Sequence, residues 1–247
     1  MHGLLKLAWV EAKIYLRQPE AFFFTLVFPL LLLFLFGGIF GNKPHPLFGG
    51  RGTVDVSTPA YMALIIGSTG LISISIAVSG YREKGILRRY RATPLRPATI
   101  LAAQVLVHYV MSLAGACLLV AAARLLFGLR FSGRMESVFA GFTLSCLSFF
   151  AAGFLLASLA RNTRSAYILG MVIYFPNIFL SGATFPREIF PPVIRTISEA
   201  LPITHVVSLL QGLWIGNPWS RHLTEVLVLV GILAAGVIIS ARVFRWE

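Results

Sequence analysis

Residues 80–98 read GYREKGILRRYRATPLRPA, a polar and strongly basic stretch that lies between two long apolar runs. It carries six of the chain's 21 Lys and Arg residues, namely Arg82, Lys84, Arg88, Arg89, Arg91 and Arg96. Basic residues concentrate in the cytoplasmic loops of membrane proteins. A basic loop between two uncharged runs therefore predicts a cytoplasmic connection between two membrane-spanning helices.

The same stretch has the pattern of a short amphipathic helix. Residues 83–92 contain no helix breaker except Gly85, and Pro94 ends the segment. Three apolar side chains at helical spacing form a small face among the arginines: Ile86, Leu87 and Tyr90. Such a helix suits docking against a cytoplasmic partner. The alternative is that the arginines only anchor the loop to anionic lipid headgroups.

Composition places the whole chain in the membrane. Of 247 residues, 57% are hydrophobic and 12% are charged, whereas soluble domains carry about 25% charged residues. Several apolar runs approach the roughly 20 residues that a helix needs to cross a bilayer, and they lack the alternation of barrel strands. We therefore expect an all-α integral membrane protein with a single domain over residues 1–247.

The charge and the absent motifs exclude several functions. The net charge is +12, but the basic residues gather at helix ends, so membrane lipid rather than nucleic acid is the expected partner. The sequence has no G-x-x-x-x-G-K-[ST] phosphate loop and no metal-binding Cys/His cluster. We expect no enzyme activity and no cofactor in this chain. The acidic residues avoid the middle of the apolar runs, which argues against a proton- or cation-coupled carrier.

The apolar runs divide the chain into elements. An amphipathic helix over residues 3–18 is expected to lie on the membrane surface, with Trp9 at headgroup depth. Six spans are expected, at about residues 22–41, 59–81, 99–123, 137–160, 165–181 and 223–241. Prolines divide residues 186–214 into pieces too short to span, which predicts short re-entrant or interfacial helices.

The distribution of basic residues orients these spans. With six spans, 13 of the 21 Lys and Arg residues fall on the side of the termini and 8 fall on the other side, over longer segments. The excess predicts cytoplasmic termini and an outward-facing proline-divided stretch. The frequent use of Arg over Lys fits a bacterial protein, and hence the bacterial inner membrane.

Three spans carry unusual polar residues. The second span has small residues on one side, which permit close helix packing, our preferred interpretation, or line a polar path: Gly67, Ser68, Thr69, Gly70, Ser73, Ser75 and Ser79. The fifth span is interrupted by Pro176 and Asn177, and the asparagine either satisfies a freed backbone group or faces a path. His108 in the third span is either a neutral, bonded histidine or a working one.

Two motifs together resemble the ABC-2 family of transporter membrane subunits. Residues 81–97 (YREKGILRRYRATPLRP) are similar to the family's E-x-G-(x)-L-R-R-x-x-A-T-P-L segment. Residues 180–186 (LSGATFP), followed by Pro191 and residues 201–204 (LPIT), are similar to its S-G-x-x-x-P … P … L-P-x-T pattern. The amphipathic helix and six spans match the family layout over essentially the whole chain, and Gln211 departs from an arginine found in many relatives.

The resemblance implies a function. Two permease subunits, identical or different, would pair above two cytoplasmic ATPase subunits that bind ATP and Mg, and would export a drug-like molecule, a lipid or a lipid-linked glycan by alternating access. The implied coupling residues are Glu83, Ile86, Leu87, Arg88, Arg89, Tyr90 and Arg91. The candidate path residues are Ser73, Phe175, Asn177 and Ser181, and the outer lid would include Phe185, Pro186, Pro191 and Pro202. A membrane scaffold or a secondary carrier without an ATPase is the alternative.

Overall fold

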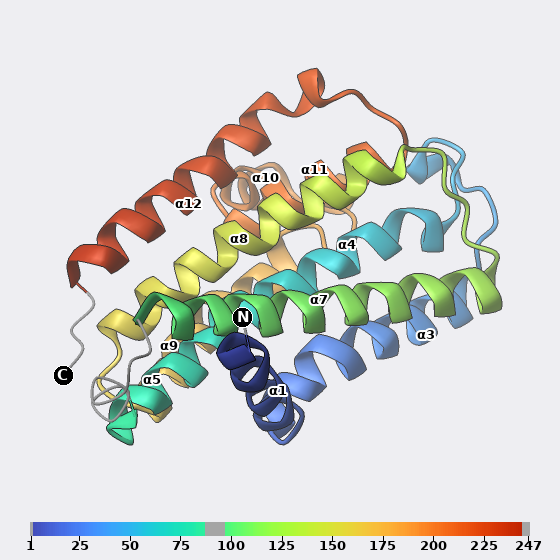
Figure 1. The fold of residues 1–247 in the computed structure, drawn as a ribbon. Coiled ribbons are helices and arrows are strands. Elements are labelled where there is room, and N and C mark those ends of the chain that lie inside the picture. Colours follow the sequence, from blue (N-terminus) through green and yellow to red (C-terminus); the bar gives the residue numbers. More distant parts are fainter. Residues whose placement is uncertain (1, 87–96, 244–247) are drawn as a thin grey trace.

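The computed structural model describes residues 2–86 and 97–243, and these residues form helices joined by turns and loops. Long helices lie side by side in one bundle, and α1 crosses them at a steep angle (Figure 1). The first half contains α1 (His2–Leu16), α2 (Pro19–Phe22), η1 (Phe23–Val27), α3 (Phe28–Phe40), η2 (Pro46–Phe48), α4 (Thr53–Ser68), η3 (Thr69–Ile74) and α5 (Ser75–Glu83). The second half contains α7 (Pro97–Phe127), α8 (Met135–Leu159), α9 (Thr163–Leu180), η4 (Arg187–Ile189), α10 (Pro192–Glu199), α11 (Pro202–Trp214), η5 (Trp219–His222) and α12 (Leu223–Val243).

Length and apolarity confirm an all-α integral membrane protein. Five continuous helical segments of the described residues can cross a membrane: Pro19–Phe40, Thr53–Glu83, Leu101–Phe127, Met135–Leu159 and Trp219–Ser240. The predicted span 165–181 is the helix α9, which is not among these five, because Arg164, Pro176 and Asn177 lower its apolarity. The pair α10 and α11, bent by 90°, gives a sixth candidate. A crossing by α9 stays a prediction.

Two spans are longer than the sequence pattern predicted. The second begins at Thr53 rather than near residue 59, because the Gly52 N–H donates to the Asp55 carboxylate (3.3 Å) and starts the helix within the predicted loop. Pro59 is accommodated inside this helix. The third span, α7, continues past Arg124 to Phe127.

The segment Thr53–Glu83, made of α4, η3 and α5, is the most buried span of the bundle. Its middle, η3, is π-helical. Glycines let neighbouring backbones touch it: a Cβ at Gly70 would lie 2.6 Å from the Phe149 oxygen, one at Gly153 would overlap the Gly70 oxygen, and one at Gly170 would lie 2.5 Å from the Leu71 oxygen. The close-packing interpretation of the small residues is thereby confirmed at Gly70.

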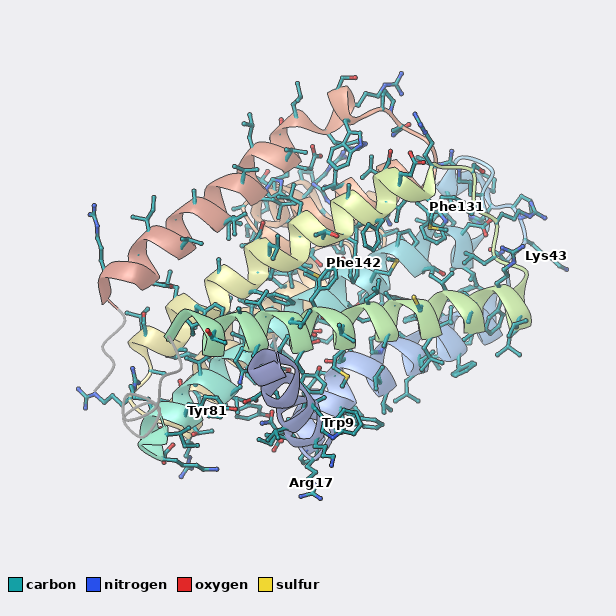
Figure 2. The ribbon with its side chains drawn as sticks, viewed as in Figure 1. Trp9, Arg17, Lys43, Tyr81, Phe131 and Phe142 are labelled. Carbon is teal, nitrogen blue, oxygen red and sulfur yellow. The ribbon has the colours of Figure 1, made fainter. Side chains whose placement is uncertain are left out.

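The two ends of the bundle differ. We call the end that carries Arg82, Lys84 and Arg164 the basic end, and the opposite end, around Asn42 and Asp55, the far end. At the far end the buried Asp55 carboxylate accepts hydrogen bonds from the Asn42 side chain (2.9 Å) and the Arg130 N–H (2.8 Å). These contacts tie the loops after α3 and α7 to the start of α4. Figure 2 shows Lys43 at this end pointing away from the bundle, while Phe142 lies among the helices.

The amphipathic helix α1 packs beside α7 and is tied to the central span. Tyr15 is buried, and its hydroxyl is hydrogen-bonded to that of Thr25 (2.7 Å), which is hydrogen-bonded in turn to Thr69 in η3 (3.3 Å). Trp9 is exposed on the opposite side of the helix, with the Lys13 ammonium 5.1 Å from the centroid of its ring (Figure 2). One face of α1 therefore packs on the bundle and the other is free for an interface with lipid.

The proline-divided stretch forms short helices, as predicted. Pro202 begins α11, whose first turn lies beside Asn177 in α9. Its last residue, Trp214, donates from Nε1 to the Arg130 carbonyl at the far end (3.2 Å). The helix is almost entirely buried against α4, α8 and α12. It thus runs from inside the bundle, beside Asn177, to the far end.

The backbone contact at Gly70 predicts the effect of adding one methyl group. We expect Gly153→Ala to destabilise the protein by about 1–3 kcal/mol, since the new Cβ overlaps the Gly70 carbonyl and forces the two helices apart. Thermal unfolding in detergent measures the change. Gly231→Ala in α12 is the matched control, because a Cβ there meets no atom within 4 Å; equal melting temperatures for the two variants would contradict the packing.

Candidate functional site

The end of α5 is joined to the turn between α8 and α9. One oxygen of the Glu83 carboxylate accepts hydrogen bonds from the Thr163 N–H (2.9 Å) and the Thr163 hydroxyl (2.6 Å). Arg82, the preceding residue, donates to the Ala160 carbonyl. Two successive side chains therefore hold the last turn of α5 against the last turn of α8 and the first turn of α9. We call these contacts the 82–83 clamp.

The clamp also caps α9. The Asn162 side chain accepts hydrogen bonds from the Ser165 N–H and hydroxyl, both at 2.8 Å. Glu83 accepts the N–H of Thr163, so two of the N–H groups that a helix start leaves unpaired have side-chain acceptors. A carboxylate at this position is also stabilised by the positive end of the helix dipole of α9. The geometry of α9 at its start thus depends on α5.

The first predicted coupling residue, Glu83, belongs to the clamp, and the other predicted coupling residues follow it. Gly85, with φ of 62°, ends α5 in the left-handed conformation that glycine adopts without strain. Ile86 is half-buried and faces a cavity between α1, α5 and α7. The remaining predicted coupling residues, Leu87, Arg88, Arg89, Tyr90 and Arg91, lie outside the described residues. Their docking role stays a prediction.

Asn177 joins α9 to the start of α11. Its Oδ1 accepts the N–H of Ile203 (3.3 Å) and its Nδ2 donates to the Ile173 carbonyl (2.8 Å). It therefore supplies a side-chain acceptor to the first turn of α11, whose own N-cap residue, Leu201, makes no side-chain capping bond. Ser181, one turn further along, is buried and its hydroxyl accepts the Ala183 N–H (3.3 Å).

The other path candidates lie elsewhere. Ser73 is buried within η3, and its hydroxyl has no hydrogen-bond partner among the described residues. Phe175 is 52% exposed on the outside of α9, packed edge-to-face on Phe179 (5.3 Å between centroids). Phe175 is therefore exposed on the outside of the bundle, whereas Ser73, Asn177 and Ser181 are buried inside it, and a path role for the four residues stays a prediction.

An apolar cavity of about 220 Å³ lies between η3, α8, α9 and α12. Asn177, a path candidate, and Pro202, a lid candidate, both line it, together with Leu71, Phe149 and Ile232. The polar atoms of Asn177 are engaged by α9 and α11, so the cavity presents hydrocarbon surface. It would suit an apolar group rather than an ion.

The other lid candidates gather around the short helices. Pro186 and Pro191 directly precede η4 and α10, where a fixed φ favours the start of a helix. Phe185 is 39% exposed and packs edge-to-face on Phe36 of α3, with 6.1 Å between centroids. These contacts connect the short helices to the first span. A gating role for them stays a prediction.

Sequence reasoning missed a polar cluster at the basic end. Glu11 of α1 is only 4% exposed, and its carboxylate accepts a 2.7 Å hydrogen bond from the buried Gln104 of α7. Burial raises the pKa of Glu11 to about 7, although the bond from Gln104 opposes the rise. The burial of Glu11 could have been predicted from helical spacing. Glu11 and Tyr15 share one face of the helix with apolar neighbours, and Lys13 and Arg17 lie on another face.

In the described residues, a helical bundle with several apolar helices long enough to cross a bilayer defines a multispanning membrane protein. The chain belongs to the ABC-2 type transporter family, whose model matches residues 3–214. The expectation drawn from the two motifs is confirmed.

Curated relatives agree with this family. The chain is 25% identical over 160 residues to the "Probable multidrug ABC transporter permease YbhS" of Escherichia coli K12, covering 64% of this chain and 42% of that protein. It is 25% identical over 238 residues to the "Putative transport permease ycf38" of Porphyra purpurea, covering 92% and 79%. It is 25% identical over 173 residues to the "Inner membrane transport permease YhhJ" of E. coli K12, covering 70% and 44%. The chain spans less than half the length of these two E. coli relatives.

The hydrogen bond from the Ile203 N–H to the Asn177 side chain leads to a second prediction, about the stability of the protein. Asn177→Ala removes the acceptor of the Ile203 N–H in a buried, apolar place, and we expect a loss of about 0.5–2 kcal/mol in the free energy of unfolding. The thermal midpoint in detergent reports this loss. Asn217→Ala, in the loop after α11, is the control; a loss no greater at 177 than at 217 would show that the cap contributes nothing.

Proposed function

We propose that this chain is the membrane subunit of an ATP-driven exporter in a bacterial inner membrane, with its termini in the cytoplasm. Two such subunits pair, and two separate ATPase subunits bind ATP and Mg beneath them. The exported molecule is hydrophobic or amphiphilic. The observation that carries the proposal is the 82–83 clamp, since it fastens the beginning of the basic segment to a second long helix.

The clamp supports a route for mechanical coupling. A push on the segment that follows Glu83 acts first on the end of α5 and, through Thr163, on the start of α9. The helix α5 continues directly from η3, the π-helical part of the central span, and α9 packs against η3. Because π-helical turns are less regular than α-helical ones and are frequent at functional sites, η3 is the point where the bundle would adjust. Access would then switch between the two sides.

The apolar lining of the cavity beside Asn177 supports a hydrophobic or amphiphilic substrate. The cavity beside Asn177 and Pro202 offers hydrocarbon surface and no charged side chain. Its volume of about 220 Å³ holds one apolar group rather than a complete large amphiphile. The name of the E. coli relative YbhS, a probable multidrug permease, agrees with a drug-like substrate.

The coupling role predicts the result of a charge reversal. In Arg88→Glu/Arg89→Glu we expect the ATPase subunit to be lost on co-purification in mild detergent, because two like charges replace a cationic docking surface. Mass identification of co-purified proteins, with western detection of the permease in the membrane fraction, measures both association and insertion.

The control is Lys43→Glu/Arg51→Glu, which reverses two charges at the far end and should leave the ATPase bound. We also expect the Arg88/Arg89 variant to lose transport and the Lys43/Arg51 variant to keep it, as coupling through the basic segment requires. If the wild-type chain brings down no nucleotide-binding subunit, the exporter is excluded and a scaffold or a carrier takes its place. If the ATPase stays bound in the Arg88/Arg89 variant, the basic segment is not its docking site.

A further inference from the structure

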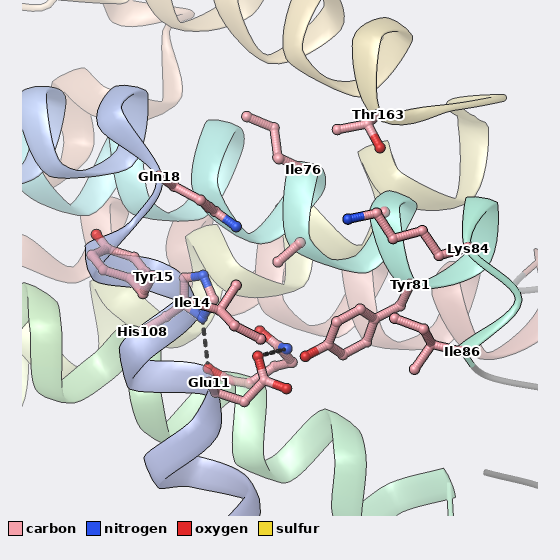
Figure 3. Close-up of a pocket in the computed structure, with 13 residues that line it drawn as sticks. Glu11, Ile14, Tyr15, Gln18, Ile76, Tyr81, Lys84, Ile86, His108 and Thr163 are labelled. Carbon is pink, nitrogen blue, oxygen red and sulfur yellow. Dashed lines mark hydrogen bonds between the residues drawn. The ribbon is translucent and has the colours of Figure 1, made fainter. Parts of the chain in front are cut away.

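A cavity of about 230 Å³ opens at the basic end, between α1, α5 and α7 (Figure 3). Glu11 and Gln104 form part of its wall, with Tyr81 and His108 beside them. Ile14, Ile76 and Ala77 provide an apolar side. The cavity thus combines a carboxylate with hydrocarbon surface, unlike the apolar cavity beside Asn177.

The polar groups of this cavity have hydrogen-bonding capacity left over. The Glu11 carboxylate accepts one bond from Gln104, but a carboxylate can accept several. The other amide atom of Gln104, Oε1, is buried without a hydrogen-bond partner among the described residues. Figure 3 shows the Tyr81 hydroxyl pointing toward Glu11. The remaining lone pairs of Glu11 and the Gln104 Oε1 atom can therefore accept further hydrogen bonds from a bound donor.

The Glu11 carboxylate also has no ion-pair partner among the residues that the structure describes. None of the three ion pairs found among the described residues involves Glu11. Lys84 lines the same cavity from the end of α5, without being paired to Glu11. A buried carboxylate without a counter-ion is costly unless it is protonated or binds a positive group. The site is therefore complementary to a cationic donor.

We propose that this cavity binds the primary ammonium group of an amphiphilic amine, with Glu11 as the counter-ion and the apolar wall holding the adjoining hydrocarbon. The ammonium donates to the free Glu11 oxygen and to Gln104 Oε1. The helix α1 lies where an amphiphile in the adjacent leaflet would present its polar head. This assignment rests on the proposed function and narrows its substrate class to amines.

The titration of Glu11 predicts that amine binding depends on pH. Its pKa of about 7 means that the carboxylate is ionised at pH 8 and mostly neutral at pH 6. The other titratable groups of the cavity are Lys84, His108, Tyr15 and Tyr81. Because only the ionised form pairs with an ammonium, we expect the apparent affinity to fall by about tenfold from pH 8 to pH 6.

The test measures binding by the isolated permease in lipid nanodiscs, without any ATPase. The probe is 4-fluorobenzylamine, followed by ¹⁹F NMR, with 4-fluorobenzyl alcohol as the neutral analogue. We expect saturable binding of the amine at pH 8, no competition by the alcohol, and a loss of affinity of about tenfold or more in Glu11→Gln. Glu20→Gln, an exposed carboxylate in α2, should bind as the wild type does.

A second variant covers the case in which Glu11→Gln fails to fold. Ala77→Leu keeps the carboxylate and fills the cavity, and it should also abolish binding. Equal binding of amine and alcohol, or wild-type affinity in both cavity variants, would overturn the proposal. Since no ATPase is present, such a failure leaves the exporter function standing, whereas failed co-purification would overturn the exporter and leave this site standing.

Discussion

The structure depends on direct backbone contact between the central span and its neighbours. At Gly70, Gly153 and Gly170 there is no room for a Cβ, so η3, α8 and α9 meet with main chain against main chain. The Ser75 hydroxyl adds a hydrogen bond to the Gly153 carbonyl (3.0 Å). In lipid, where apolar side chains gain little by leaving their solvent, such close contacts and interhelical hydrogen bonds supply most of the association.

This backbone contact explains how motion at one end of the bundle can reach the other end. Because η3 is held on two sides, motion at the basic end cannot be absorbed by loose packing in the middle. The 82–83 clamp joins α5 to the start of α9, and Asn177 joins the later part of α9 to the first turn of α11. A continuous series of bonded elements therefore runs from the basic segment through α9 to the short helices.

The fold class could be predicted from the sequence, because it depends on features that neighbouring residues reveal. These features are the apolar runs, the proline-divided pieces and the small residues around Gly70. Local pattern could not predict contacts between distant residues. The partner of Glu11 lies 93 residues away and that of Glu83 lies 80 residues away. Asn177 was expected to bond locally or to face a path, yet one of its bonds reaches the first turn of α11, at Ile203, 26 residues later. Thr53 starts its helix because Asp55 meets Asn42 and Arg130, which no periodicity reveals.

The central claim is that α5 and α9 move as one unit when the basic segment is pushed. Spin labels at Lys84 and Arg164, both exposed, report their separation by double electron–electron resonance in the reconstituted complex, with labelled subunits diluted among unlabelled ones. We predict that this distance is the same with and without ATP, while the distance from Lys84 to a label at Arg242 on α12 changes. An ATP-dependent change between Lys84 and Arg164 would show that the clamp opens and would contradict the account.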